Sequence, residues 1–146
     1  MSLRSKTLAT WLALTGGSLG MHRFYMFGFK DKLAWLHPWP TLIGYYGVQR
    51  MELLGQDDHL AWALIPLLGL MLAQSMLQAI VYGLTSDEKW DARYNGGQVS
   101  TPSGWAAIIA VVLSLLLGAS ALMATIAFGS QRFFESQVEA SQELSQ

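Results

Sequence analysis

Cysteine is absent from the 146 residues of this chain, and charged residues make up only 13% of it. The first absence excludes disulfides, thiolate metal sites and cysteine nucleophiles. The formal net charge is −1, and the sequence has no basic cluster of the kind that binds nucleic acid. We therefore expect no nucleic-acid partner.

Patterns that mark catalytic or metal sites are also scarce. The three histidines are scattered, and none has a second histidine four residues away as zinc hydrolases do (His22, His37 and His59). The chain also has no P-loop pattern. We expect no metal, no cofactor and no enzymatic activity.

Apolar residues are abundant instead, at 52% of the chain, with a mean hydropathy of +0.31. They are concentrated in stretches, of which Leu60–Leu84 and Trp105–Phe128 are each about 24 residues long. A helix of that length crosses a hydrocarbon core of roughly 30 Å at 1.5 Å per residue. The composition and the two stretches predict a membrane protein with at least two spans.

The N-terminal apolar stretch is shorter. Arg4 and Lys6 precede it, as basic residues precede the apolar core of a signal peptide. Cleavage after Ser18 or Gly20 is one interpretation, but the residues that follow continue a packed element and favour an uncleaved anchor. We expect a span over 7–21, with the next two residues at the membrane interface.

The segment 33–54 is the weakest span. Pro38 and Pro40 lie near its start, and Arg50 and Glu52 interrupt its end. We expect four transmembrane helices with both termini on one side; three helices plus a re-entrant or interfacial segment is the alternative. With four spans, Lys and Arg divide four against five between the two sides, so the positive-inside rule leaves the orientation open.

The longest polar loop covers 85–104. Thr85 and Glu88 have the spacing of a capping box, which predicts a short helix over 87–94. Trp90 and Tyr94 then share one face, as in a helix lying on a membrane surface. We divide the chain into a helix-turn-helix domain (1–55), a C-terminal helical pair (56–129) and a polar tail (130–146).

Small residues recur at the spacing that lets membrane helices approach closely, and we expect these to pack helices within the bundle or between copies: Gly16, Gly17, Gly20, Ala110, Ser114 and Gly118. The third span carries a polar stripe of Gln74, Ser75 and Gln78. Such a stripe usually bonds to a neighbouring helix, and its alternative role is to line a hydrated path.

The most specific pattern is the run Gly16-Gly17-Ser18-Leu19-Gly20-Met21-His22-Arg23-Phe24-Tyr25, followed by Gly28. Over about Leu3–Leu54 the chain resembles the TM2 domain family. In that family two hydrophobic helices are joined by a turn with this signature. The resemblance implies an integral membrane protein, names no reaction, and assigns the signature turn to His22, Arg23, Phe24, Tyr25 and Gly28.

Two roles for this turn follow from its chemistry. As a structural element, Arg23 reaches a lipid phosphate while His22 caps the carbonyls at the end of the first helix. As a functional element, the turn docks a lipid headgroup or another membrane protein.

These observations predict an all-α, small polytopic membrane bundle in the bacterial inner membrane. We expect a structural component that binds membrane lipid, a membrane-protein partner or a second copy of itself. The alternative is a subunit of an oligomeric pore or transporter for ions or small solutes.

Overall fold

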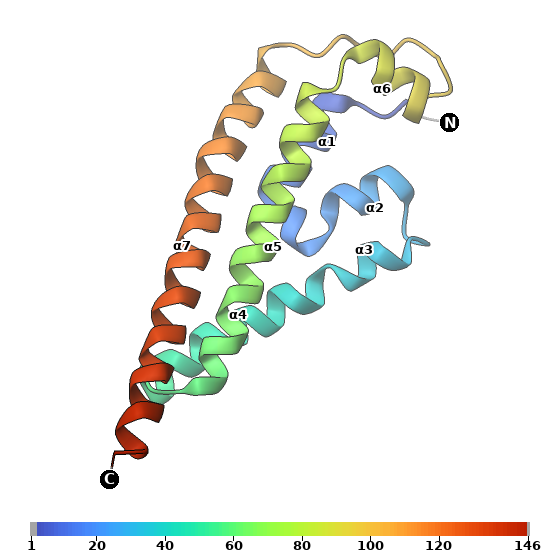
Figure 1. Ribbon diagram of the computed structural model, residues 1–146. Coiled ribbons are helices and arrows are strands. Elements are labelled where there is room, and N and C mark those ends of the chain that lie inside the picture. The colour runs from blue at the N-terminus through green and yellow to red at the C-terminus, as the bar shows by residue number, and fades with distance from the viewer. Residues whose placement is uncertain (1–2, 146) are drawn as a thin grey trace.

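The computed structural model describes residues 3–145, and among these it contains helices and loops but no strand. The helices, labelled in Figure 1, are α1 (Lys6–Gly16), the 3₁₀ helix η1 (Gly17–Leu19), α2 (Met21–Phe27), α3 (Lys32–Leu36), α4 (Pro38–Leu54), α5 (His59–Leu84), α6 (Asp87–Tyr94) and α7 (Trp105–Glu143). The expected all-α class is confirmed.

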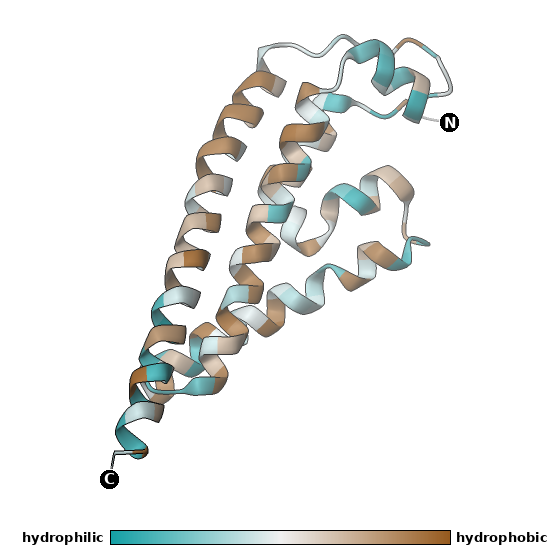
Figure 2. Ribbon diagram, viewed as in Figure 1, coloured by the Kyte–Doolittle hydropathy of each residue, from teal (hydrophilic) through white to brown (hydrophobic). Residues whose placement is uncertain are grey.

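Two helices, α5 and α7, form the framework of the molecule. They lie side by side and antiparallel over most of their length (Figure 1). Within residues 3–145 they are the two helices that are long and apolar enough to cross a membrane. Only 17% and 22% of their most apolar windows are buried, so their hydrophobic surfaces, brown in Figure 2, face outward rather than into a soluble core. The four expected transmembrane helices are not confirmed.

The expected helix over 7–21 does not form as a single unit. Helix α1 ends at Gly16, after 11 residues. The chain then makes the short turn η1 and passes through Gly20, whose φ of 81° is left-handed. Glycine adopts this conformation without the steric cost that a side chain would add. As a result α2 turns away from α1 instead of extending it (Figure 1).

The segment expected to be a weak span is helical despite its prolines. Helix α3 is followed by His37, which keeps a right-handed helical conformation, and then by α4. Pro38 is tolerated because it occupies the first turn of α4, where no intrahelical donor is required. Together the two helices run diagonally from the α2 turn to the far end of the molecule (Figure 1).

Helix α4 packs closely on the half of α5 nearest His59. A Cβ added at Gly44 would lie 2.4 Å from the backbone nitrogen of Leu68, and one at Gly47 would lie 2.6 Å from the Cβ of Leu64. Only glycine allows the two backbones to come this close, a device common between membrane helices. Near the C-terminal end of α4, Arg50 pairs with Asp58, the N-cap residue of α5.

The opposite end of α5 is covered by α6 and the N-terminal segment. The expected helix over 87–94 forms, but its N-cap is Ser86 rather than Thr85, which ends α5 and donates to the carbonyl of Val81. The indole of Trp90 is fully buried and donates to the carbonyl of Arg4 at 2.8 Å. Figure 1 shows the N-terminal segment at this end and the C-terminus at the other, whereas four spans would place both together.

Candidate functional site

Three glycines build the turn that carries the signature residues. A Cβ at Gly17 would lie 2.6 Å from the Cβ of Ser75, so this glycine lets η1 lie directly on α5. A Cβ at Gly20 would lie 2.7 Å from the carbonyl oxygen of Ala34, and one at Gly16 would overlap the Met21 side chain. The glycine-rich run therefore brings α1, α3 and α5 together at one point.

The guanidinium of Arg23 is held within the protein. Its Nε and Nη2 each lie 2.9 Å from Oδ2 of Asp31, and its charge stacks 5.1 Å from the centre of the Phe27 ring. Between these partners Gly28 has a φ of 79° and ends α2. The structure thus gives Arg23 a carboxylate partner, where the sequence predicted a lipid phosphate.

An aromatic group projects beyond this ion pair. The rings of Phe29 and Trp35 both contact Phe24, at centroid distances of 5.4 and 5.2 Å, and the Trp35 indole donates to the carbonyl of Phe29 at 2.9 Å. Phe29 is 77% exposed and Trp35 58% exposed, and Lys30 and Lys32 are exposed beside them. We call the five residues Phe24, Phe29, Lys30, Lys32 and Trp35 the aromatic tip.

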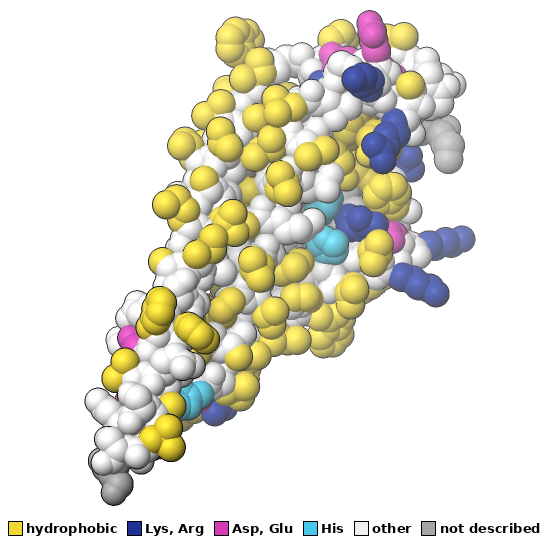
Figure 3. All heavy atoms as spheres, in the orientation of Figure 1, with side chains coloured by type: hydrophobic (Ala, Val, Ile, Leu, Met, Phe, Trp, Pro, Cys, Tyr) yellow, Lys and Arg dark blue, Asp and Glu magenta, His cyan; other side chains and the backbone are white. Residues whose placement is uncertain are grey.

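Helix α2, which leads to the tip, is anchored to the N-terminal segment through Tyr25. The Tyr25 hydroxyl accepts a hydrogen bond from the backbone nitrogen of Ser5 at 2.8 Å. The Tyr25 ring also packs on the core cluster that contains Trp90. Figure 3 shows the Lys and Arg side chains of this face gathered mainly around α6 and the α2–α3 turn.

His22 is the buried member of the signature turn, with 1% of its surface exposed. Its ring meets that of His37 at a centroid distance of 5.6 Å and that of Tyr82 at 6.0 Å. Among residues 3–145 no carbonyl accepts a hydrogen bond from it, so the predicted capping contact with α1 is not formed.

The three residues of the polar stripe do not meet in one cavity. Ser75 is buried and donates to the carbonyl of Leu72 at 2.8 Å. Gln74 is exposed and lines a mainly apolar groove between α5 and α7, whereas Gln78 is half-buried. The small residues of α7 face inward: Ala110 and Ser114 are buried, and a Cβ at Gly118 would lie 2.7 Å from Met76.

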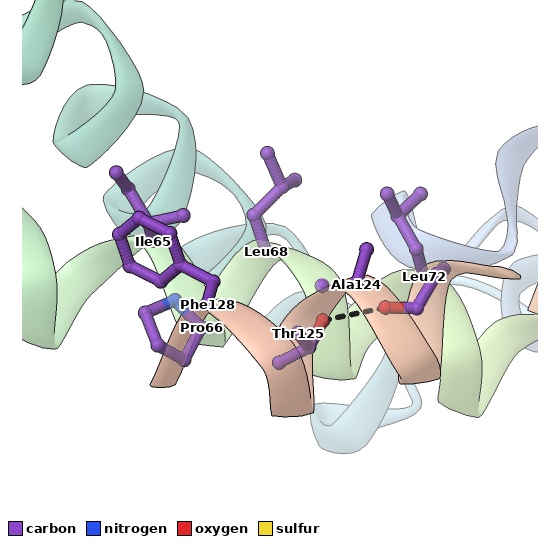
Figure 4. Close-up of a pocket in the computed structure, with 9 residues that line it drawn as sticks. Ile65, Pro66, Leu68, Leu72, Ala124, Thr125 and Phe128 are labelled. Carbon is purple, nitrogen blue, oxygen red and sulfur yellow. Dashed lines mark hydrogen bonds between the residues drawn. The ribbon is translucent and has the colours of Figure 1, made fainter. Parts of the chain in front are cut away.

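A second groove between α5 and α7, of about 340 Å³, lies nearer the C-terminal end (Figure 4). Pro66 and Phe128 lie at one end of it, and the Thr125 hydroxyl donates to the carbonyl of Ala121 at 2.7 Å. With its one hydroxyl occupied in this way, the groove presents apolar carbon and no grouping of chemically reactive side chains.

The same turn matches a sequence pattern of serine hydrolases. Gly16-Gly17-Ser18-Leu19-Gly20 has the G-x-S-x-G spacing of a nucleophile elbow. That elbow joins a strand to a helix, whereas here the run joins α1 to α2 through η1. Among the described residues no histidine is hydrogen-bonded to the Ser18 hydroxyl, and the carbonyl of Ser18 accepts from Thr41. In this structure the run therefore forms a packing turn between α1 and α2.

Sequence reasoning also missed Asp31 and the approach of His37 to His22. The only local signal for Asp31 was an acidic residue between two lysines just after Gly28. Over residues 3–145 no group of three or more His, Asp or Glu side chains is placed to hold a metal ion.

Comparison with models of protein families, with curated proteins and with solved structures finds no match.

Proposed function

We propose that this chain is a non-catalytic, multi-pass protein of the bacterial inner membrane, of TM2-domain type, that binds anionic lipid headgroups through its aromatic tip. The observation that carries this proposal is the exposure of Phe29 and Trp35 beside Lys30 and Lys32. Tryptophan favours the headgroup layer, and lysines near the surface are attracted to anionic lipid by about 1 kcal/mol each.

The internal ion pair supports this role for the tip. Because Asp31 binds Arg23, the carboxylate does not oppose an approaching phosphate with a free negative charge. Trp35 is fixed by its bond to the Phe29 carbonyl. A tip that is already ordered loses little conformational entropy when it binds.

The arrangement of helices supports three crossings rather than four. In this proposal the chain crosses the membrane three times: first with α3 and α4 together, then with α5, and then with α7. The segment of α1, η1 and α2 forms a re-entrant hairpin. The 11 residues of α1 extend only about 16 Å, roughly half of a hydrocarbon core. This is the alternative of three helices plus a re-entrant segment, with the hairpin at 6–27 in place of 33–54.

Three crossings also give the charges a clear division. Two cations lie near the start of α5, where Arg50 pairs with Asp58 and Arg132 stacks on Trp62. The other seven of the nine Lys and Arg residues precede α4 or lie in α6. Because cytoplasmic loops carry the excess of Lys and Arg, we propose that the N-terminus, the aromatic tip and α6 face the cytoplasm.

The test measures lipid preference by native mass spectrometry of the full chain with equal amounts of phosphatidylglycerol and phosphatidylcholine. The intact protein should retain phosphatidylglycerol preferentially, and the double variant Lys30→Gln with Lys32→Gln should lose most of that preference. Lys89→Gln, an exposed cation on α6, is the matched control and should keep it. Equal retention of both lipids by the unaltered chain would contradict the proposal.

A further inference from the structure

The His22 imidazole lies where η1 and α2 meet α5. The Cβ position of Gly17 is 3.5 Å from its Nδ1, and the Tyr82 ring packs on it edge to face. This buried Nδ1 has no hydrogen-bond partner in the protein. A neutral imidazole fits such a contact, whereas a charged one would require a counter-charge or water.

A second imidazole completes the pair. His37 Nδ1 lies 2.8 Å from the carbonyl oxygen of Leu33. Because a carbonyl can only accept, Nδ1 must carry the hydrogen and Nε2 holds the lone pair of the neutral ring. This Nε2 is also buried without a partner. Each ring thus has one buried nitrogen that lacks a hydrogen-bond partner in the protein.

The charged groups around the imidazole pair disfavour adding a proton to it while the rings stay buried. Arg23 follows His22 in the sequence, and Asp31, the acid of the same turn, is bound to Arg23. From α5 the pair is faced by the Tyr82 phenol and by Ser75, whose hydroxyl is bonded to Leu72. In the described part of the chain no carboxylate forms an ion pair or hydrogen bond with either ring. An added proton would therefore place a second positive charge beside Arg23 without compensation.

We propose that His22 and His37 form a proton-operated latch between the α1–α2 hairpin and the rest of the bundle. With both rings neutral the hairpin stays packed against α5 and the start of α4. In the open form the His22 ring reaches water or headgroups and binds a proton that the closed form excludes. Each pH unit below the ordinary imidazole pKa of about 6.5 then lowers the ratio of closed to open protein by up to tenfold through His22.

Because the chain contains no cysteine, a single introduced thiol can report opening without background labelling. Ser75→Cys places a thiol at a position that is 1% exposed and covered by Gly17, and Ser141→Cys places one on the exposed end of α7. The labelling rate by a small neutral methanethiosulfonate reagent is measured for each in detergent micelles from pH 8 to pH 5. Dividing the labelling rate at position 75 by the rate at position 141 removes the effect of pH on the reactivity of the thiol group.

We expect the normalised rate at position 75 to rise at least tenfold between pH 7.5 and pH 5. His59→Gln, which alters the distant third histidine, should leave this rise intact. His22→Phe keeps a ring against Tyr82 but cannot bind a proton, and it should remain closed and flat across the range. A flat response without any histidine change, or an unchanged rise in His22→Phe, would overturn the proposal.

Discussion

Arg23 and Asp31 are joined twice, through Nε and Nη2 at 2.9 Å each, across a turn in which Gly28 has a φ of 79°. This pair fixes the position of the aromatic tip relative to α2. It also takes up a carboxylate that would otherwise lie between the two lysines of the tip. The ion pair therefore determines both the shape and the charge that this turn presents.

Asp31→Asn tests the structural contribution of the pair. The substitution leaves the half-buried guanidinium of Arg23 without its anion, and a hydrogen bond to a charged group contributes about 1.5–3 kcal/mol. We expect the free energy of unfolding in detergent to fall by about that amount. Exchanging the charges, Arg23→Asp with Asp31→Arg, should recover part of the loss. Full stability of Asp31→Asn alone would show that the pair contributes nothing.

The extent to which the sequence predicted this turn has a physical explanation. The apolar stretch of α5 and the position of α6 follow from local composition and match the expected ranges closely. Helix α7 begins at the expected Trp105 but continues through the polar tail to Glu143, well beyond the apolar stretch that ends at Phe128. Arg23 with Asp31 and His22 with His37 depend on how η1 and Gly20 reverse the chain. A helical repeat does not encode that reversal, so the first stretch reads as one continuous span.

The α4–α5 contact shows the same limitation. Gly44 and Gly47 are three residues apart in a segment that composition marks as a weak span, and their role emerges only when Leu64 and Leu68 lie against them. The cap of α6 differs by one residue because Thr85 and Ser86 are both good caps, and the path of α5 decides between them.

Gly44→Ala should destabilise the bundle. Its Cβ would lie 2.4 Å from the Leu68 backbone, which cannot move aside as a flexible side chain can. We expect a loss of about 1–3 kcal/mol, in the range of overpacked cores, measured by thermal unfolding in detergent. Gly129→Ala is the matched control, because nothing lies within 4 Å of its Cβ position in the interior of α7. It should stabilise the protein by about 0.5–1 kcal/mol.

The contact between Lys6 and Asp87 gives a pH prediction separate from that of the histidine pair. The Lys6 ammonium, 2.7 Å away, and the bonds from Ser103 hold the pKa of Asp87 below its ordinary value of 3.8. The stabilisation from this contact is therefore complete above pH 3.8 and is lost as the pH falls through the lower pKa of the folded state.

Hydrogen exchange measures that loss at the Arg4 backbone amide. This amide donates to Asn95, in the same contact between the N-terminal segment and the α6 region. Protection of this amide should persist at pH 5 and decline below pH 3.8. Asp87→Asn should show reduced protection at pH 5 and a weaker pH response. Identical protection in both proteins at pH 5 would show that Asp87 does not stabilise the contact between the N-terminal segment and α6.

The central claim, three crossings with the N-terminus and α6 in the cytoplasm, is tested most directly by labelling single cysteines in intact cells with an impermeant maleimide. The variants are Leu3→Cys and Gln98→Cys for the end that holds α6, and Asp57→Cys and Ala140→Cys for the opposite end. We predict that Asp57→Cys and Ala140→Cys are labelled from outside, whereas Leu3→Cys and Gln98→Cys react only after the membrane is opened. Labelling of Leu3→Cys and Ala140→Cys from the same side would contradict this account.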